Sequence, residues 1–168
     1  SFSVRPDSGW QAGENGVRFG DRFRLCAPVT ELDPQDITVQ GFPFFHGAMR
    51  LKRTITMQDT SWQLRCAGRV QYVRVFVNGQ KAGTLLFSDT LELSPYLHPG
   101  ENALELELMA SNRNLFGPHH NAEDPEPPFV DPTLFSLYGS WHGGKSEGYR
   151  EDYAFVRFGL DELQGYRT

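Results

Sequence analysis

Residues 73–87, VRVFVNGQKAGTLLF, alternate apolar and polar side chains around a central Asn-Gly pair, and this pattern gives the clearest indication of the fold. Three valines recur at every second position of its first half, the period of a half-buried strand: Val73, Val75 and Val77. Asn78 and Gly79 tolerate the positive φ angles that a tight primed turn requires. The stretch therefore predicts a β-hairpin, with Leu85 and Phe87 facing the valines from the return strand.

Short strand-like stretches of the same kind run along most of the chain. They alternate, carry β-branched or aromatic residues, and end in Gly, Asn, Asp or Pro. They cover residues 17–28, 36–45, 48–57, 61–68, 72–79, 82–88, 102–110 and 152–160. We therefore expect an all-β protein: an antiparallel β-sandwich of the jelly-roll kind, with residues 1–168 forming a single module.

Charge and hydropathy exclude two classes of partner. The net charge of -5 leaves no basic stripe for a nucleic-acid backbone. No apolar run approaches the roughly 20 residues that cross a bilayer, so we expect no membrane partner and a soluble protein. The chain begins at Ser1, in a strand-like SFSV, which suggests a processed chain or a piece of a longer polypeptide. The sequence therefore does not indicate the cellular compartment of the protein.

Residues 89–110 continue the strand pattern after a turn. One helical turn is expected before HPGEN, where Pro99-Gly100 has the signature of a type II turn. The strand that follows places its leucines inward, and Glu105 and Glu107 outward. Two carboxylates side by side on one face cannot flank a glycosidic bond from opposite sides, so we interpret this pair as a solvated face.

The chain lacks the common catalytic and metal-binding motifs. Cys26 and Cys66 lie 40 residues apart, outside any CxxC pattern, which favours two buried reduced thiols over a disulfide or metal role. No G-x-S-x-G, P-loop or H-E-x-x-H sequence is present. Ser140 and His142 are too close together in a loop to form a nucleophile and its base. We therefore expect no independent enzyme.

One long stretch resembles a known family. Residues 73–108 combine VNG, a return strand with AG, D-x-L-E-L-S and YLHPGEN. They resemble the galactose-binding-like, jelly-roll sugar-binding domain attached to bacterial glycoside hydrolases of family 2 and their relatives. GFPFFHGAMRLKRTITM, residues 41–57, is similar to the stretch that precedes it in those domains. NRNLFGPHH and DYAFVRFGL are similar to the C-terminal end of large bacterial glycoside hydrolases.

The resemblance implies a C-terminal, noncatalytic, carbohydrate-binding or accessory module of a bacterial glycoside hydrolase, in the cytoplasm or secreted. Its partners would be a glycan and the neighbouring domains of the parent chain. The alternative is a purely structural domain that packs against the parent's catalytic domain without binding glycan. The family often holds a structural calcium, for which Asp59, Asp89 and Asp152 are candidates. The chain has no D-x-D-x-D-G spacing, so we expect no cofactor and no metal.

NRNLFGPHH, residues 112–120, is the first candidate site. In the structural interpretation, Asn112 and Asn114 cap strand ends, Leu115 and Phe116 plug the sandwich edge, and the Gly-Pro pair turns the chain. In the functional interpretation, four polar side chains bind sugar hydroxyls: Arg113, Asn114, His119 and His120. The structural interpretation is favoured, because no third metal ligand accompanies the histidines.

The second candidate site is aromatic, because a sugar ring stacks its C-H face on a flat aromatic side chain. The preferred cluster lies in YGSWHGGKSEGY: Trp141, Tyr138, His142 and Lys145. Trp10 stands in a Gly-rich opening loop and is a further candidate, whereas Trp62 alternates with Leu64 and is expected in the core. A lid, or docking onto another domain, explains the cluster equally well. His46 is interpreted as a turn residue.

Overall fold

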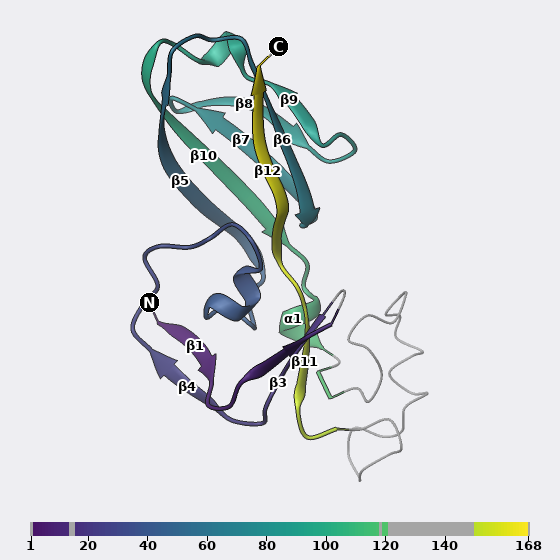
Figure 1. The fold of residues 1–168 in the computed structure, drawn as a ribbon. Coiled ribbons are helices and arrows are strands. Elements are labelled where there is room, and N and C mark those ends of the chain that lie inside the picture. The colour runs from purple at the N-terminus through teal and green to yellow at the C-terminus, as the bar shows by residue number, and fades with distance from the viewer. Residues whose placement is uncertain (1, 14–15, 118, 121–149, 168) are drawn as a thin grey trace. The chain divides into compact units, whose positions relative to one another are not determined.

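The computed structural model describes residues 2–13, 16–117, 119–120 and 150–167 (Figure 1). Strands dominate these residues and all their pairings are antiparallel, so the all-β prediction is confirmed. The chain folds as two compact units. Unit 1 comprises Ser1–Glu31, Ile37–Phe45 and Asn112–Arg157, and unit 2 comprises Leu32–Asp36, His46–Ser111 and Phe158–Thr168. The single-module organisation stays a prediction.

Unit 2 is a β-sandwich. Its larger sheet has the strand order β5-β10-β7-β8: β5 (Gly47–Met57), β10 (Gly100–Ala110), β7 (Tyr72–Val77) and β8 (Gln80–Leu85). Its smaller sheet has the order β12-β6-β9: β12 (Gly159–Arg167), β6 (Trp62–Arg69) and β9 (Thr90–Glu92). The expected helical turn before β10 is a 3-10 turn, η2 (Ser94–Tyr96), and Gly100 has the positive φ, 98°, of the predicted Pro-Gly turn.

The predicted hairpin is β7 and β8. Asn78 and Gly79 both have positive φ, 51° and 79°, as a primed turn requires, and the three valines of β7 are buried. Leu85 packs inside the sandwich with them. The prediction for Phe87 is wrong: its side chain is 99% exposed, because β8 ends at Leu85 and the chain then crosses to β9.

The outer face of β10 differs from the predicted solvated face. Leu106 and Leu108 point into the sandwich as expected, but the side chain of Glu107 is only 7% exposed. Arg50 Nε donates to one of its oxygens at 2.8 Å and Arg74 Nη1 to the other at 2.7 Å. These hydrogen bonds hold the pKa of Glu107 below its ordinary value. Two arginines on neighbouring strands therefore cover the carboxylate.

The described residues of unit 1 form two small sheets and two helical turns. One sheet pairs β1 (Ser3–Pro6) with β4 (Phe23–Cys26). The other has the order β11-β3-β2: β11 (Tyr153–Val156), β3 (Gly16–Phe19) and β2 (Trp10–Ala12). The turns are η1 (Ile37–Gln40) and α1 (Arg113–Phe116). An aromatic core of Val17, Phe19 and Phe155, with Phe23, Phe44 and Tyr153 against it, holds the unit together.

Three predicted strands are wrong in their extent. Residues 36–45 form η1 and a loop instead of a strand, because Gly41 has a φ of 112° and Pro43 follows it. Residues 17–28 divide into β3 and β4, which belong to different sheets. Residues 152–160 divide into β11 of unit 1 and β12 of unit 2. At the second division Gly159 has a φ of 146°, and an added Cβ would lie 2.6 Å from backbone atoms of residues 34 and 36.

Both cysteines are free thiols, as the spacing predicts. Cys66 is 5% exposed in the sandwich, and its burial raises the pKa of the thiol to about 12. Cys26 is only half-buried, so the prediction that both are buried holds for Cys66 alone. Among the helices of the described ranges, none has the length and apolar character needed to span a bilayer.

Candidate functional site

The sandwich is closed along one side and open along the other. On the closed side, β8 and β9 approach so tightly that a Cβ on Gly83 would lie 2.6 Å from Leu91. On the open side, the edge strands β5 and β12 border a groove of about 620 Å³. This volume is within the range of small-molecule sites. Leucines from both sheets and from the η2 region give the groove an apolar lining: Leu64, Leu93, Leu97 and Leu104.

Trp62 gives the groove an aromatic wall. It is the first residue of β6 and pairs with Arg167, so it lies beyond the buried Leu64 and remains half-buried. The ring extends over Gly165 of β12, where an added Cβ would lie 3.5 Å from it. The prediction that Trp62 belongs to the core is therefore wrong, because β12 places no side chain at Gly165 and the groove opens there.

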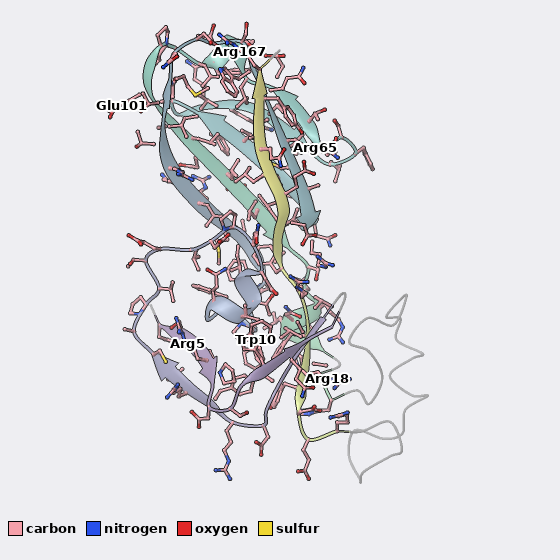
Figure 2. All side chains as sticks on the ribbon, viewed as in Figure 1. Arg5, Trp10, Arg18, Arg65, Glu101 and Arg167 are labelled. Carbon is pink, nitrogen blue, oxygen red and sulfur yellow. The ribbon has the colours of Figure 1, made fainter. Side chains whose placement is uncertain are left out.

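Two charged residues hold Trp62 in place. Its indole Nε1 donates a hydrogen bond to Oδ1 of Asp59 at 2.9 Å, and Arg167 binds the other oxygen of the same carboxylate. Figure 2 shows Arg167 at the C-terminal end of β12. The carboxylate therefore bridges the indole and the guanidinium, and its hydrogen bond to Nε1 favours one orientation of the ring.

Polar side chains rim the apolar floor. Three glutamines and two arginines line the groove: Gln58, Gln63, Gln164, Arg53 and Arg167. Planar amide and guanidinium groups offer several donors in fixed directions, which suits the closely spaced hydroxyls of a sugar. The arrangement can therefore stack a ring against Trp62 and hydrogen-bond its edges.

Within the segment 112–120, residues Arg113–Phe116 form a single helical turn, α1, beside β11. Asn114 is 2% exposed, and its side chain pairs with the backbone of Val156 in both directions. Its Nδ2 donates to the Val156 carbonyl at 2.8 Å, and its Oδ1 accepts from the Val156 N–H at 2.9 Å. Asn114 thus provides hydrogen-bond partners for the backbone at the end of β11, as the structural interpretation predicts. The side chain of Asn112 makes no such capping bond, and Phe116 is 68% exposed instead of plugging an edge.

The two histidines of this segment, His119 and His120, lie beside β11. Nε2 of His119 donates to the Asn114 carbonyl at 2.9 Å, and its ring packs 5.2 Å from that of Phe155. Burial lowers the pKa of His119, with the nearby Arg113 and His120 as smaller causes in the same direction. The ring of His120 lies 4.4 Å from that of Tyr153, and its backbone pairs with Arg150.

The structure brings four predicted site residues together and separates a fifth. Arg113, Asn114, His119 and His120 cluster beside β11, whereas Trp10 lies on β2, at the far edge of the order β11-β3-β2. The side chain of Trp10 is 46% exposed. The residue is labelled in Figure 2. The remaining predicted residues lie outside the described ones: Tyr138, Trp141, His142 and Lys145. A sugar-binding role for any of these residues stays a prediction.

Each of the three aspartates that are candidates for binding calcium forms an ion pair with an arginine. Asp59 binds Arg167, Asp89 binds Arg65 at 2.7 Å, and Asp152 binds Arg150 at 2.9 Å. In the part of the chain that the structure describes, no group of three or more His, Cys, Asp or Glu could hold a metal ion. His46 is exposed next to Gly47, whose φ is 81°.

Comparison with known proteins gave structural likenesses only. No family model and no curated protein matches the chain. A rhamnosidase from Novosphingobium sp. PP1Y is similar at 16% identity and a TM-score of 0.43, over 92% of this chain and 14% of its own. A β-glucuronidase from Bifidobacterium dentium is similar at 14% identity and a TM-score of 0.42, over 95% of this chain and 30% of its own.

A β-glucuronidase from Dictyoglomus thermophilum is similar at 16% identity and a TM-score of 0.35, over 95% of this chain and 28% of its own. All three are glycoside hydrolases, and the chain spans less than a third of the length of each. Their TM-scores are below 0.5, so the grounds for a function are the residues of the chain itself.

Proposed function

We propose that this chain is a noncatalytic, carbohydrate-binding accessory module of a bacterial glycoside hydrolase, and that the groove between β5 and β12 binds the sugar. The observation that carries the proposal is the half-buried Trp62 ring on the wall of this groove. The galactose-binding-like domains that residues 73–108 resemble have the same role in their parent enzymes.

The groove is organised before any ligand arrives. The Asp59 carboxylate holds the indole Nε1 and is itself held by Arg167, so little freedom is lost when a sugar ring stacks on Trp62. The glutamines and Arg53 around it supply donors for hydroxyl groups. The leucines below would meet the C-H face of the sugar.

The chemistry of the groove supports binding without cleavage. Most glycoside hydrolases need two carboxyl groups on opposite sides of the scissile bond. Asp59 is the one acidic residue among the described groove-lining side chains, and its charge is balanced by Arg167. The catalytic residues of the parent enzyme would belong to another domain.

A structural role is the second candidate, and exposed apolar side chains favour it. Leu86 and Phe87 follow β8 and are 56% and 99% exposed, so a neighbouring domain of the parent chain would bury two large apolar groups there. In this case the groove would bind no sugar, and Leu86→Ser with Phe87→Ser would weaken association with the parent catalytic domain.

A glycan array followed by isothermal titration of the full chain tests the proposal. We expect binding to selected oligosaccharides that Trp62→Ala reduces at least about tenfold, the effect of one lost stacking contact of about 1.4 kcal/mol. Trp62→Phe keeps an aromatic ring and should retain most of the binding. Trp10→Ala, an exposed tryptophan outside the groove, is the matched control. The proposal is wrong if no glycan binds, or if Trp10→Ala removes binding and Trp62→Ala does not.

A further inference from the structure

Arg53 occupies an inward-facing position of β5, where a strand of a β-sandwich normally has an apolar residue. Along β5, the inward-facing positions pair with the inward leucines of β10: Met49 with Leu108, and Leu51 with Leu106. Arg53 continues this series and pairs with Leu104, and the next inward residue is Ile55. Because side chains alternate between faces, Arg53 projects from the inner face of the sheet at the open edge, where it lines the groove.

The charge of Arg53 has no acidic partner among the residues that the structure describes. On the outward face of the same strand, Arg50 binds Glu107 at 2.8 Å and Lys52 binds Glu105 at 2.7 Å. Arg53 forms no ion pair with any side chain in the described ranges, although the groove contains the carboxylate of Asp59. That carboxylate is engaged by Arg167 and the indole of Trp62.

The groove therefore carries one net positive charge above an apolar floor. Asp59 and Arg167 cancel, and Arg53 is left with a guanidinium that can pair in bidentate fashion with a planar or tetrahedral oxyanion. An anionic group on a ligand would gain a charge-assisted hydrogen bond there, whereas a neutral sugar would gain only ordinary ones.

We propose that the groove selects acidic saccharides, and that Arg53 binds their oxyanion, either the carboxylate of a uronic acid or a sulfate ester. This inference rests on the proposed function and adds the substrate class to it. Trp62 would hold the ring of the acidic sugar, and Arg53 would hold its charge from the opposite sheet.

A structural explanation predicts a different outcome. An inward-pointing charge on an edge strand also prevents that strand from pairing with the edge of another molecule. If this is the role of Arg53, its replacement by a neutral residue would cause self-association and leave the preference among glycans unchanged.

The test compares matched ligands on the full chain. The array carries glucuronate- and galacturonate-containing oligosaccharides, the same oligosaccharides as methyl esters, neutral hexose counterparts and sulfated counterparts. We expect the acids to bind at least about tenfold more tightly than their methyl esters, with affinity falling as sodium chloride is raised. Tighter binding of the uronates identifies the carboxylate, and tighter binding of the sulfated sugars identifies the sulfate ester.

Two variants test whether Arg53 causes the preference for acidic glycans. Arg53→Gln removes the charge but keeps an amide donor for hydroxyl groups, so it should bring the acids to the affinity of the methyl esters. Lys52→Gln removes one positive charge from the outward face of the same strand and should keep the preference. Size-exclusion chromatography of Arg53→Gln should show an unchanged oligomeric state.

The outcomes separate the two proposals. If no glycan of any kind binds, the proposed function fails and this inference fails with it. If acidic and neutral glycans bind equally, or if Arg53→Gln keeps the preference, the module binds glycans but the inference about Arg53 is wrong.

Discussion

The side chain of Asn78 donates a hydrogen bond from Nδ2 to Oδ1 of Asn102 at 2.9 Å, and this contact joins the turn of the β7–β8 hairpin to the start of β10. Asn102 is 1% exposed, and its own amide donates to the carbonyls of His98 and Gly100 at 2.7 and 3.1 Å. Oδ1 of Asn78 accepts from the N–H of Ala103 at 3.0 Å. Each asparagine therefore binds backbone groups at or just before the start of β10, and the two side chains are hydrogen-bonded to each other.

Asn102→Ala should destabilise the chain by about 3 kcal/mol, because the substitution leaves several buried donors and acceptors without partners. The free energy of unfolding in urea measures this loss. Glu101→Ala, at the exposed neighbouring position labelled in Figure 2, should change it by less than about 0.5 kcal/mol. Similar losses for the two variants would mean that the asparagine network contributes nothing beyond the turn itself.

Asn114→Ala should cost about 2 kcal/mol of unfolding free energy, because both backbone groups of Val156 lose their partner at a buried position. Thermal unfolding followed by circular dichroism gives the change. Asn112→Ala is the matched control, since the side chain of Asn112 makes no capping bond and lies exposed in the same turn. If Asn114→Ala keeps full stability and loses glycan binding, the segment is a site and the structural interpretation is wrong.

The parts of the fold that the sequence predicts well depend on neighbours along the chain. The hairpin at Asn78-Gly79 follows from period-two alternation and from the φ angles that its turn residues tolerate, both of which are local properties. The stretch 36–45 shows the limit of such signals. Ile37, Thr38 and Val39 have strand propensity, but they form a 3-10 turn in which Ile37 and Thr38 are buried. The hydroxyl of Thr38 donates to the carbonyl of Val156, which is distant in the sequence.

Local sequence signals also do not predict where a long strand-like stretch divides between two sheets. Residues 152–160 have continuous strand character, yet Phe155 belongs to the aromatic core of unit 1 and Leu160 to the sandwich of unit 2. Propensity does not state which sheet a residue joins, because that depends on pairing with strands far away in the chain.

The groove was missed for a related reason. It forms because β5 and β12, which are more than 100 residues apart in the sequence, are edge strands on the same open side of the sandwich. One signal was available: in MRLKRTITM, residues 49–57, Arg53 interrupts a series of apolar residues at alternate positions. The alternation shows that Arg53 is unusual for a strand position of this kind, but it does not show that the residue lines the same groove as Trp62.

His119 gives unit 1 a pH dependence whose sign is fixed by its surroundings. Aromatic rings pack around the imidazole, and burial is the main cause that lowers its pKa, while the hydrogen bond to the Asn114 carbonyl acts in the opposite direction. The unfolded chain, in which the histidine has its ordinary pKa of 6.5, therefore binds more protons than the folded chain below that pH.

The free energy of unfolding should accordingly be highest above pH 6.5 and fall as the pH is lowered from 7 toward 5, levelling off once the pH passes the lowered pKa of the folded state. Glu107, whose pKa lies below its ordinary 4.5, adds a separate loss only at more acidic pH. Urea unfolding at a series of pH values measures the slope. His119→Gln keeps a hydrogen-bond donor for the Asn114 carbonyl and should flatten the slope between pH 5 and 7, whereas His46→Gln, at an exposed position, should leave it unchanged. A slope that persists in His119→Gln would assign the pH dependence to another group.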